Sequence, residues 1–350
     1  WIGLGSNLLV RDGGIRGAVI DTHGVFDELT RIDDTNGRST QKTMSPNLPV
    51  AAISFRLVRV TPRSVWAFVE AESRDGCHGI GEATLIGRER DLLGSAERLL
   101  PHTVSGRHAA PADQPDAAIL SALDQALHDI DARRKGLSIA ENLGKVRNSS
   151  IPLYANINRR TRERTPEAFA ESARRAIEAG YAAVKLAPFD EVRPDAPLST
   201  LEAGLARIDA VRGVLSPEHR LMVDCHERFA PQVARDAVAE LAKLGVEWVE
   251  SLILETEDNI DHIRDLRRLA NQRGMRLAGL ENAFRLQDFR RFADAYDVLM
   301  PDVKYIGGIS GLLDAGRILA DSGAAVSPHN PNGPVSHAAS LHAAALVPKI

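Results

Sequence analysis

The first half of the chain shows two kinds of apolar pattern. Between residues 53 and 72, apolar and polar positions alternate and include β-forming side chains such as Val58 and Val65, which predicts strands of a small antiparallel sheet. Between residues 115 and 134, apolar residues recur three and four positions apart, which predicts an amphipathic helix. The pattern of this half therefore predicts a small sheet followed by a helix.

Residues 151–350 have a different pattern, in which short apolar segments alternate with amphipathic helical ones such as 166–179 and 232–244. The predicted strands are residues 152–157, 182–186, 221–225, 246–250, 277–281, 298–302 and 324–329. This regular alternation indicates parallel strands joined by right-handed crossovers, and seven units predict an α/β fold closed into a barrel. We expect the last strand to be missing, because the sequence stops at Ile350 in a helix-like segment. An open doubly wound sheet is the alternative, but no G-x-G-x-x-G segment opens a helix after the first strand.

Composition narrows the class of protein. Lys and Arg number 43 against 47 Asp and Glu, so the net charge of −4 lacks the basic excess of nucleic-acid-binding proteins. The two cysteines, Cys77 and Cys225, exclude a disulfide-rich scaffold and fit a reducing compartment. No apolar run approaches the roughly 18 residues of a membrane span, and the first residues lack a signal peptide's features. We expect a cytoplasmic protein with neither a nucleic-acid nor a membrane partner.

Ionisable residues stand at the C-terminal ends of six successive predicted strands. They are Lys185, Asp224 with His226, Glu250, Glu281, Asp302 with Lys304, and His329. In a parallel barrel the active site forms at this end of the strands. A single acid after a strand often caps the next helix, but six in register do not fit that explanation.

Three of these residues, Asp224, Glu250 and Glu281, are carboxylates on consecutive predicted strands. Neighbouring strands lie about 4.8 Å apart, so converging carboxylates would repel one another unless a cation neutralised them. An all-oxygen ligand set favours a hard ion, and we expect Mg²⁺.

Asp302 and His329 end adjacent predicted strands. A carboxylate bonded to one imidazole nitrogen leaves the other nitrogen to take a proton, so we interpret the pair as a catalytic dyad. A buried histidine with satisfied hydrogen bonds is the alternative, but the proline-rich loop of residues 327–334 favours function. His226 follows Asp224 by two positions, so strand alternation predicts that the two share a face.

Several motifs together resemble the enolase superfamily, in its mandelate racemase/muconate lactonizing enzyme branch, over residues 49–350. The motifs are Gly79-Ile80-Gly81-Glu82-Ala83, residues 122–129, Val184-Lys185-Leu186, Met222-Val223-Asp224-Cys225-His226, Trp248-Val249-Glu250, Gly279-Leu280-Glu281-Asn282 and residues 300–308. The resemblance implies an α+β capping domain over a barrel of the (β/α)7β TIM-barrel type and one essential Mg²⁺. It also implies abstraction of the proton α to a carboxylate, with the enediolate stabilised on the metal.

Residue by residue, Asp224, Glu250 and Glu281 match the metal ligands of that family, and Asp302 and His329 match its His-Asp dyad. Lys185 matches the first lysine of a Lys-x-Lys motif, whose second lysine, the usual opposite-face base, is replaced here by Ala187.

The Asp-x-His sequence at His226 resembles the acid-sugar dehydratases, in which that histidine is the general acid that expels the β-hydroxyl. The leading hypothesis is a lyase that dehydrates a sugar acid to a 2-keto-3-deoxy acid, with His329 as base, His226 as acid and Lys185 as a second cation. One alternative is a racemase or epimerase of a hydroxy or amino acid derivative that uses His329 with Lys185. The other is an inactive truncated or fused family member. For His226 itself, the alternative is that the side chain caps the following helix or faces solvent.

The predicted partner is a small-molecule carboxylate, and self-association into a homo-oligomer stays open. Tyr154, Asn156 and Arg159 leave the first predicted strand toward the barrel mouth, so we expect them to bind a hydroxylated substrate. Asp190, in the loop after the next strand, and Lys304 are further candidates for substrate binding. A surface role is the alternative for each.

Residues 1–31 resemble a different family, the flavin-binding segment of UDP-N-acetylenolpyruvoylglucosamine reductase, around Gly5-Ser6-Asn7. The polar residues 33–43 predict a linker, and Met44 looks like an initiation site. We therefore interpret residues 1–43 as a fused fragment, with the capping domain at 44–150 and the barrel at 151–350. So short a segment cannot enclose a dinucleotide, so we predict no flavin binding; a true flavoprotein is the alternative.

Overall fold

The computed structural model describes residues 50–61, 64–104, 110–194, 196–331 and 333–350. It also describes the backbone of three short strands, β1 (Ile2–Gly3), β2 (Asn7–Leu8) and β3 (Arg31–Thr35). Strand β3 pairs antiparallel with β4 (Val50–Thr61). The rest of the flavin-like segment and the predicted linker lie outside the described residues, so the domain boundaries at 43 and 150 stay predictions.

A four-stranded antiparallel sheet, in the order β3-β4-β5-β6, forms the base of the capping region. Strands β5 (Ser64–Ser73) and β6 (His78–Glu82) follow β4, and alternate residues of β4 and β5 are buried as the sequence pattern predicts. Helices α1 (Glu89–Val104), α2 (Gln114–Lys135) and α3 (Ile139–Leu143) complete this region. A Cβ atom at Gly81 would lie 1.8 Å from the carbonyl oxygen of Ala122, so glycine allows β6 to pack directly against α2.

Seven parallel strands form the second sheet, in the order β13-β12-β11-β10-β9-β8-β7. They are β7 (Ala155–Asn156), β8 (Ala183–Leu186), β9 (Arg220–Asp224), β10 (Trp248–Glu250), β11 (Arg276–Gly279), β12 (Val298–Leu299) and β13 (Ala325–Val326). Among the described residues, β7 and β13 do not pair with each other, so the sheet curls into an open barrel. This confirms the predicted fold class.

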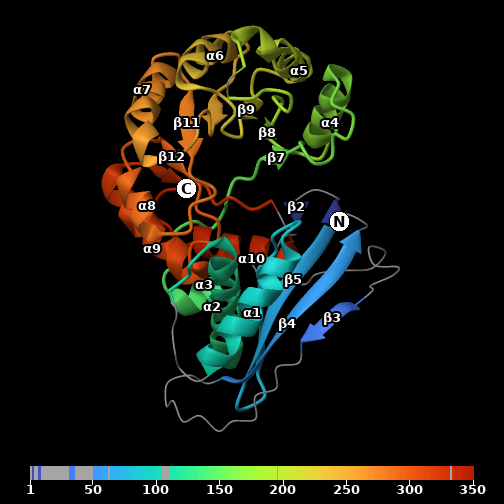
Figure 1. The fold of residues 1–350 in the computed structure, drawn as a ribbon, viewed down its shortest axis with the longest axis vertical. Coiled ribbons are helices and arrows are strands. Elements are labelled where there is room, and N and C mark those ends of the chain that lie inside the picture. The colour runs from blue at the N-terminus through green and yellow to red at the C-terminus, as the bar shows by residue number, and fades with distance from the viewer. Residues whose placement is uncertain are drawn as a thin grey trace.

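Helices alternate with these strands. They are α4 (Pro166–Glu178), α5 (Glu202–Arg212), α6 (Pro231–Lys243), α7 (Ile260–Asn271), α8 (Leu286–Arg291), α9 (Gly308–Ser322) and α10 (Pro334–Ala344), with 3₁₀ helices η1 (Leu198–Leu201) and η2 (Glu257–Asn259). Figure 1 shows α4 to α9 on the outer side of the curled sheet, while α10 lies between the sheet and the capping helices. The barrel therefore meets the capping region through α10, and α9 also packs against α2.

Several strands are shorter than the sequence predicts. The predicted strands at 298–302 and 324–329 pair only at Val298–Leu299 and Ala325–Val326, and a single parallel bridge then joins Asp302 to His329. The regular pairing of β12 with β13 therefore ends at Leu299 and Val326, before Asp302 and His329.

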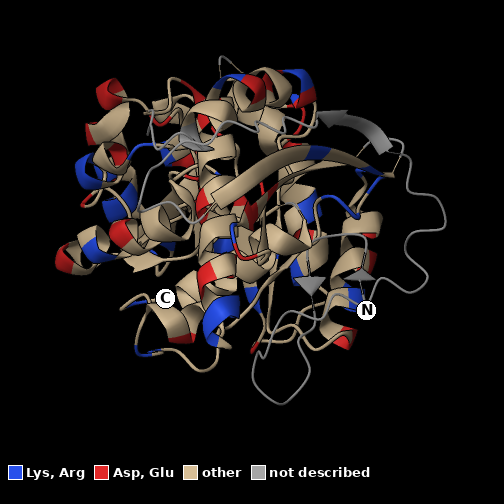
Figure 2. Cartoon of the chain, turned by 90° about the horizontal axis from the view of Figure 1, so that it is seen from below, with Lys and Arg blue, Asp and Glu red and all other residues tan. Residues whose placement is uncertain are grey.

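Charged residues of both signs are mixed around the helices and do not gather by sign (Figure 2). No helix in the described part of the chain is long and apolar enough to cross a membrane.

Candidate active site

Three carboxylates converge at the C-terminal ends of β9, β10 and β11. Asp224 and Glu250 are the last residues of their strands and are direct partners across the β9–β10 pair, and Glu281 follows β11 by two residues. Each offers one oxygen such that the three oxygens lie within 4.8 Å of one another. Asp224 is 4 % and Glu250 0 % exposed, so these charges stand close together away from bulk water.

One buried ammonium faces this cluster. The Nζ atom of Lys185, on β8, lies 2.7 Å from both carboxylate oxygens of Glu250 and 4.0 Å from Asp224. Burial raises the pKa of Glu250 well above its usual value, and repulsion from Asp224 adds to this effect. Burial alone would lower the pKa of Lys185, but Glu250 and its neighbours raise it well above the usual value. Lys185 therefore remains charged and offsets one of the three negative charges.

The carboxylate cluster fits a divalent cation. Three carboxylates and one ammonium leave a formal charge of −2 when all are ionised. Mg²⁺ binds oxygens at about 2.1 Å, so ligands on opposite sides of it are about 4.2 Å apart. The spread of the three oxygens, within 4.8 Å, is close to that value.

The backbone turns sharply beside each carboxylate. His226, Glu227, Ser251 and Leu280 have positive φ angles of 49°, 59°, 45° and 71°, the only such non-glycine residues in the described ranges. Left-handed conformations are costly for residues with a Cβ and persist where the surrounding structure enforces them. All four lie within three residues of Asp224, Glu250 or Glu281, so the strain is concentrated at the cluster.

This geometry corrects the strand argument for His226. Strand β9 ends at Asp224, and His226 lies in a left-handed turn rather than on the same strand face. The predicted proximity is nevertheless present, because the His226 Nε2 atom lies 2.9 Å from Asp224 Oδ2 and its backbone N–H donates to Asp224 Oδ1. The hydrogen bond to Asp224 raises the pKa of His226, although burial opposes the shift. With Glu227, Ser251, Glu281 and Asn282, the residue lines a hollow of about 210 Å³.

The predicted dyad is assembled. His329 Nδ1 lies 2.8 Å from Asp302 Oδ2, and its Nε2 atom lies 3.1 Å from Glu281 Oε2. Burial alone would raise the pKa of Asp302, but the charge of Lys304 and the hydrogen bond from His329 lower it. Asp302 thus stays ionised and orients the imidazole toward the carboxylate cluster.

Comparison with known proteins decides the family. Residues 40–144 match the family model of the mandelate racemase/muconate lactonizing enzyme N-terminal domain, and residues 168–350 match the enolase C-terminal domain-like model. The chain belongs to the mandelate racemase/muconate lactonizing enzyme branch of the enolase superfamily. Membership in this superfamily, together with the carboxylate cluster, implies a bound divalent metal ion.

Two relatives of this chain carry the names of sugar-acid dehydratases. The D-galactonate dehydratase of Verminephrobacter eiseniae is 25% identical over 300 residues, covering 81% of this chain and 76% of that protein. The D-gluconate dehydratase of Thermoproteus tenax is 28% identical over 236 residues, covering 67% of this chain and 46% of that protein. These matches confirm the prediction of an enzyme.

Solved structures show the same fold. A mandelate racemase/muconate lactonizing enzyme from Jannaschia sp. CCS1 superposes with a TM-score of 0.76 at 21% identity, covering 86% of this chain and 85% of that one. An enolase superfamily member from Salmonella Typhimurium has a TM-score of 0.74 at 20% identity, covering 85% and 84%.

In the present chain, the side chain of Lys304 is fully buried. Its Nζ atom lies 3.1 Å from Asp302 Oδ2 and 3.0 Å from the Tyr305 hydroxyl. The ammonium thus supports the charge of the dyad carboxylate, and direct contact of Lys304 with substrate stays a prediction.

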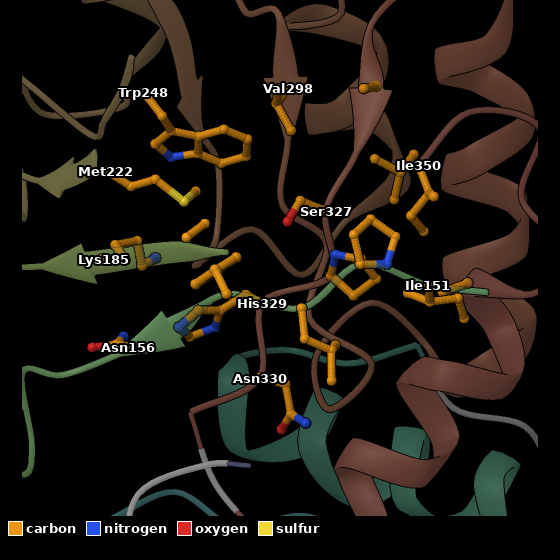
Figure 3. Close-up of a pocket in the computed structure, with 18 of the residues that line it drawn as sticks. Ile151, Asn156, Lys185, Met222, Trp248, Val298, Ser327, His329, Asn330 and Ile350 are labelled. Carbon is orange, nitrogen blue, oxygen red and sulfur yellow. The ribbon is translucent and has the colours of Figure 1, made fainter. Parts of the chain in front are cut away.

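The predicted substrate-binding residues are distributed unevenly. Tyr154 and Asn156 line a cavity of about 290 Å³ together with Lys185 and His329. Figure 3 shows Asn156, Lys185 and His329 in this cavity. Arg159 is exposed, and no carboxylate partner for it is found among the described residues. Asp190 is held at 2.5 Å by Arg164, so its carboxylate is already engaged. Contact with substrate stays a prediction for all four.

Two groups at the site escaped the sequence reasoning. Trp248 donates from Nε1 to Glu250 Oε2 at 3.1 Å, and strand alternation could have revealed it, because it stands two residues before Glu250. Glu255 accepts hydrogen bonds from the Leu280 N–H and the Tyr296 hydroxyl, and burial raises its pKa to about 8. No sequence signal marks Glu255, because its partners come from distant segments.

Proposed function

We propose that this enzyme catalyses the Mg²⁺-dependent dehydration of a sugar acid to a 2-keto-3-deoxy acid. The observation that carries the proposal is the placement of two histidines on different carboxylates of one cluster, His329 at Glu281 and His226 at Asp224. A β-elimination of water needs a base for the Cα proton and an acid for the departing hydroxyl, and the two histidines can divide those tasks. The dehydratase names of its relatives support the hydro-lyase class.

His329 is the proposed base. Its Nδ1 is held by Asp302, so Nε2 is the nitrogen that can accept the Cα proton. Asp302 also stabilises the imidazolium that forms, as a buried carboxylate does for a catalytic histidine. Because Lys304 balances the charge of Asp302, the dyad carboxylate can remain ionised away from water.

His226 is the proposed acid. Its side chain is 40% exposed and lines the hollow next to Glu281, so a substrate held at the cluster can reach it. Its Nε2 bond to Asp224 orients the ring within the left-handed turn. A proton donated from His226 would leave with the β-hydroxyl as water.

Asp224, Glu250 and Glu281 are the proposed Mg²⁺ ligands. When bound, the ion would supply positive charge opposite the carboxylate group of the substrate, where negative charge develops as the proton leaves. Lys185 adds a second cation beside Glu250, in a buried setting where fixed charges act strongly.

The structure favours dehydration over epimerisation. An epimerase needs a base on each face of Cα, and Lys185 was the candidate for the second face. Both oxygens of Glu250 hold its ammonium, and its pKa is raised, so Lys185 is a poor proton acceptor. Ala187 at the other lysine position has no ionisable group.

The direct test is a library of aldonic and aldaric acids screened with Mg²⁺ for keto-acid formation, followed by the same assay on His329→Asn and His226→Asn. We expect one acid to give a 2-keto-3-deoxy product and both variants to lose turnover. Epimerisation of the substrate without loss of water, or full turnover in both variants, would contradict the proposal. The cytoplasmic location and the absence of a nucleic-acid partner stay predictions.

A further inference from the structure

Glu82 is a fully buried carboxylate at the end of β6, in the capping region, and the proposed mechanism does not use it. Its Oε1 atom accepts hydrogen bonds from the Thr84 hydroxyl at 2.7 Å and the Gly333 N–H at 2.8 Å. Its Oε2 atom accepts from the Ser336 N–H at 3.0 Å. Gly333 and Ser336 belong to the barrel and are 251 and 254 residues further along the chain.

These two N–H groups lie at the start of α10, where backbone donors have no acceptor within the helix. Gly333 is the N-cap residue of the helix, and no side chain of the helix's own segment caps it. The first N–H groups of a helix need an acceptor, and a negative charge at this end also interacts favourably with the helix dipole. Glu82 supplies both from another part of the chain.

The packing is specific for this contact. A Cβ atom at Gly333 would lie 2.4 and 2.6 Å from the two Glu82 carboxylate oxygens, so only glycine leaves room for them. Gln125 of α2 holds the Glu82 backbone on both sides, accepting from its N–H and donating to its carbonyl oxygen. The Gln125 amide also donates to the carbonyl oxygen of Val303, the neighbour of Asp302.

The cap lies close to the dyad. Helix α10 begins five residues after His329, and the backbone is restricted by Pro331 before the helix and by Pro334 at its first position. The position of the first turn of α10 therefore limits where the His329 backbone can lie. The Gln125 contact restrains the Asp302 loop from the same side.

We propose that Glu82 is a positioning residue whose carboxylate caps α10 across the interface and thereby holds the His329 loop in register with Asp302. The inference rests on the proposed role of His329 as the base. A displacement of the base of about 1 Å can cost on the order of 100-fold in rate, so a remote cap can control turnover.

Glu82→Gln tests the proposal with almost no change in size. Three hydrogen-bond donors converge on the carboxylate, and an amide presents one NH₂ group to them, so at least one contact becomes donor against donor. Asp113→Ala is the matched control, because Asp113 caps α2 through the Asp116 N–H and lies far from the dyad in the chain.

Two readouts separate this inference from the proposed function. The first is hydrogen–deuterium exchange over residues 329–340 of the full chain with Mg²⁺ and without substrate. We expect faster exchange than in the wild type in Glu82→Gln and the wild-type exchange rate in Asp113→Ala. The second is steady-state kinetics, where we expect kcat to fall about 10- to 100-fold in Glu82→Gln with KM changed less than about threefold. Unchanged exchange, or a fall in kcat no larger than that of Asp113→Ala, would overturn the inference.

Gly333→Ala provides a second approach if Glu82→Gln fails to fold. Its Cβ atom would push the Glu82 carboxylate away from the helix without altering the acid itself. The same exchange and kcat changes are expected, and wild-type behaviour in Gly333→Ala would contradict the cap. If exchange changes as expected while His329→Asn retains full turnover, the proposed function fails and the positioning role of Glu82 fails with it, but the cap itself stands.

Discussion

The Nε2 atom of His329 lies 3.1 Å from the nearest carboxylate oxygen of Glu281. This contact joins the proposed base to the proposed metal site. The other imidazole nitrogen of His329, Nδ1, is held by Asp302. A substrate whose carboxylate is bound at the cluster would place its Cα close to this nitrogen. The predictions below follow from this arrangement and from its charge balance.

Glu281→Gln should weaken binding of Mg²⁺ or Mn²⁺ by about 100-fold or more, because the site loses one of three charged ligands. The metal-free protein should be at least as stable as the wild type, because the repulsion among the carboxylates is smaller. Titration calorimetry and thermal unfolding with and without chelator measure both effects. Glu227→Gln, beside the cluster but outside the proposed ligand set, should bind metal normally. Wild-type affinity in Glu281→Gln would remove that residue from the ligand set.

His329→Asn should slow turnover by about 10²- to 10⁴-fold, the usual contribution of a general base. Exchange of the substrate Cα hydrogen with D₂O, followed by NMR, should fall by the same factor. The exposed His262→Asn is the control and should behave as wild type. Retained exchange in His329→Asn would mean that another group removes the proton.

His226→Asn should separate the two halves of the reaction. Formation of the keto acid should fall by about 10²- to 10⁴-fold, while exchange of the Cα hydrogen with D₂O continues, because the base is intact. Equal loss of exchange and product would contradict the assignment of His226 as the acid.

Lys185→Met should destabilise the metal-free protein by about 3–5 kcal/mol, because it leaves the Glu250 carboxylate buried without its cation. Added Mg²⁺ should restore part of this loss, and urea unfolding with and without metal measures it. Lys243→Met breaks the exposed pair with Glu240 and should cost less than about 1 kcal/mol. Equal effects in the two variants would show that Lys185 does not neutralise the cluster.

Glu255 should make stability depend on pH, because its pKa is raised from 4.5 to about 8 in the folded protein. The folded state then binds more protons than the unfolded state between these values, so this contribution to stability is full below pH 4.5 and is lost as the pH rises to about 8. Glu255→Gln should flatten the fall in Tm over this range relative to wild type. Parallel Tm profiles for the two proteins would contradict the raised pKa.

Local sequence patterns were sufficient to predict most helices and strands and the kind of chemistry at the site. The alternation along β4 and β5 and the helical period of α2 depend on contacts within one element, so the sequence predicts them directly. Parallel strands also bring their C-terminal ends to one edge, so the convergence of Asp224, Glu250 and Glu281 could be predicted from strand order.

Tertiary packing decided the details at the ends of the strands. Alternation predicts that His226 lies on the same strand face as Asp224, but the residue lies in a left-handed turn. The amino-acid sequence around His226 does not indicate this turn. The sequence predicts that Lys304 is available to bind substrate, but its ammonium is buried and contacts Asp302 and Tyr305. Such outcomes depend on neighbours from other elements.

By itself, then, the sequence determined which residues alternate, which strands run parallel and which ionisable groups reach the barrel mouth. Only the tertiary structure decided how those groups pair, which of them are buried and how Glu82 reaches Gly333, 251 residues further along the chain. The physical reason is the separation along the chain between the residues that interact. Hydrophobic periodicity is a property of neighbouring residues, whereas hydrogen bonds and charge pairing between distant residues exist only after the chain has folded.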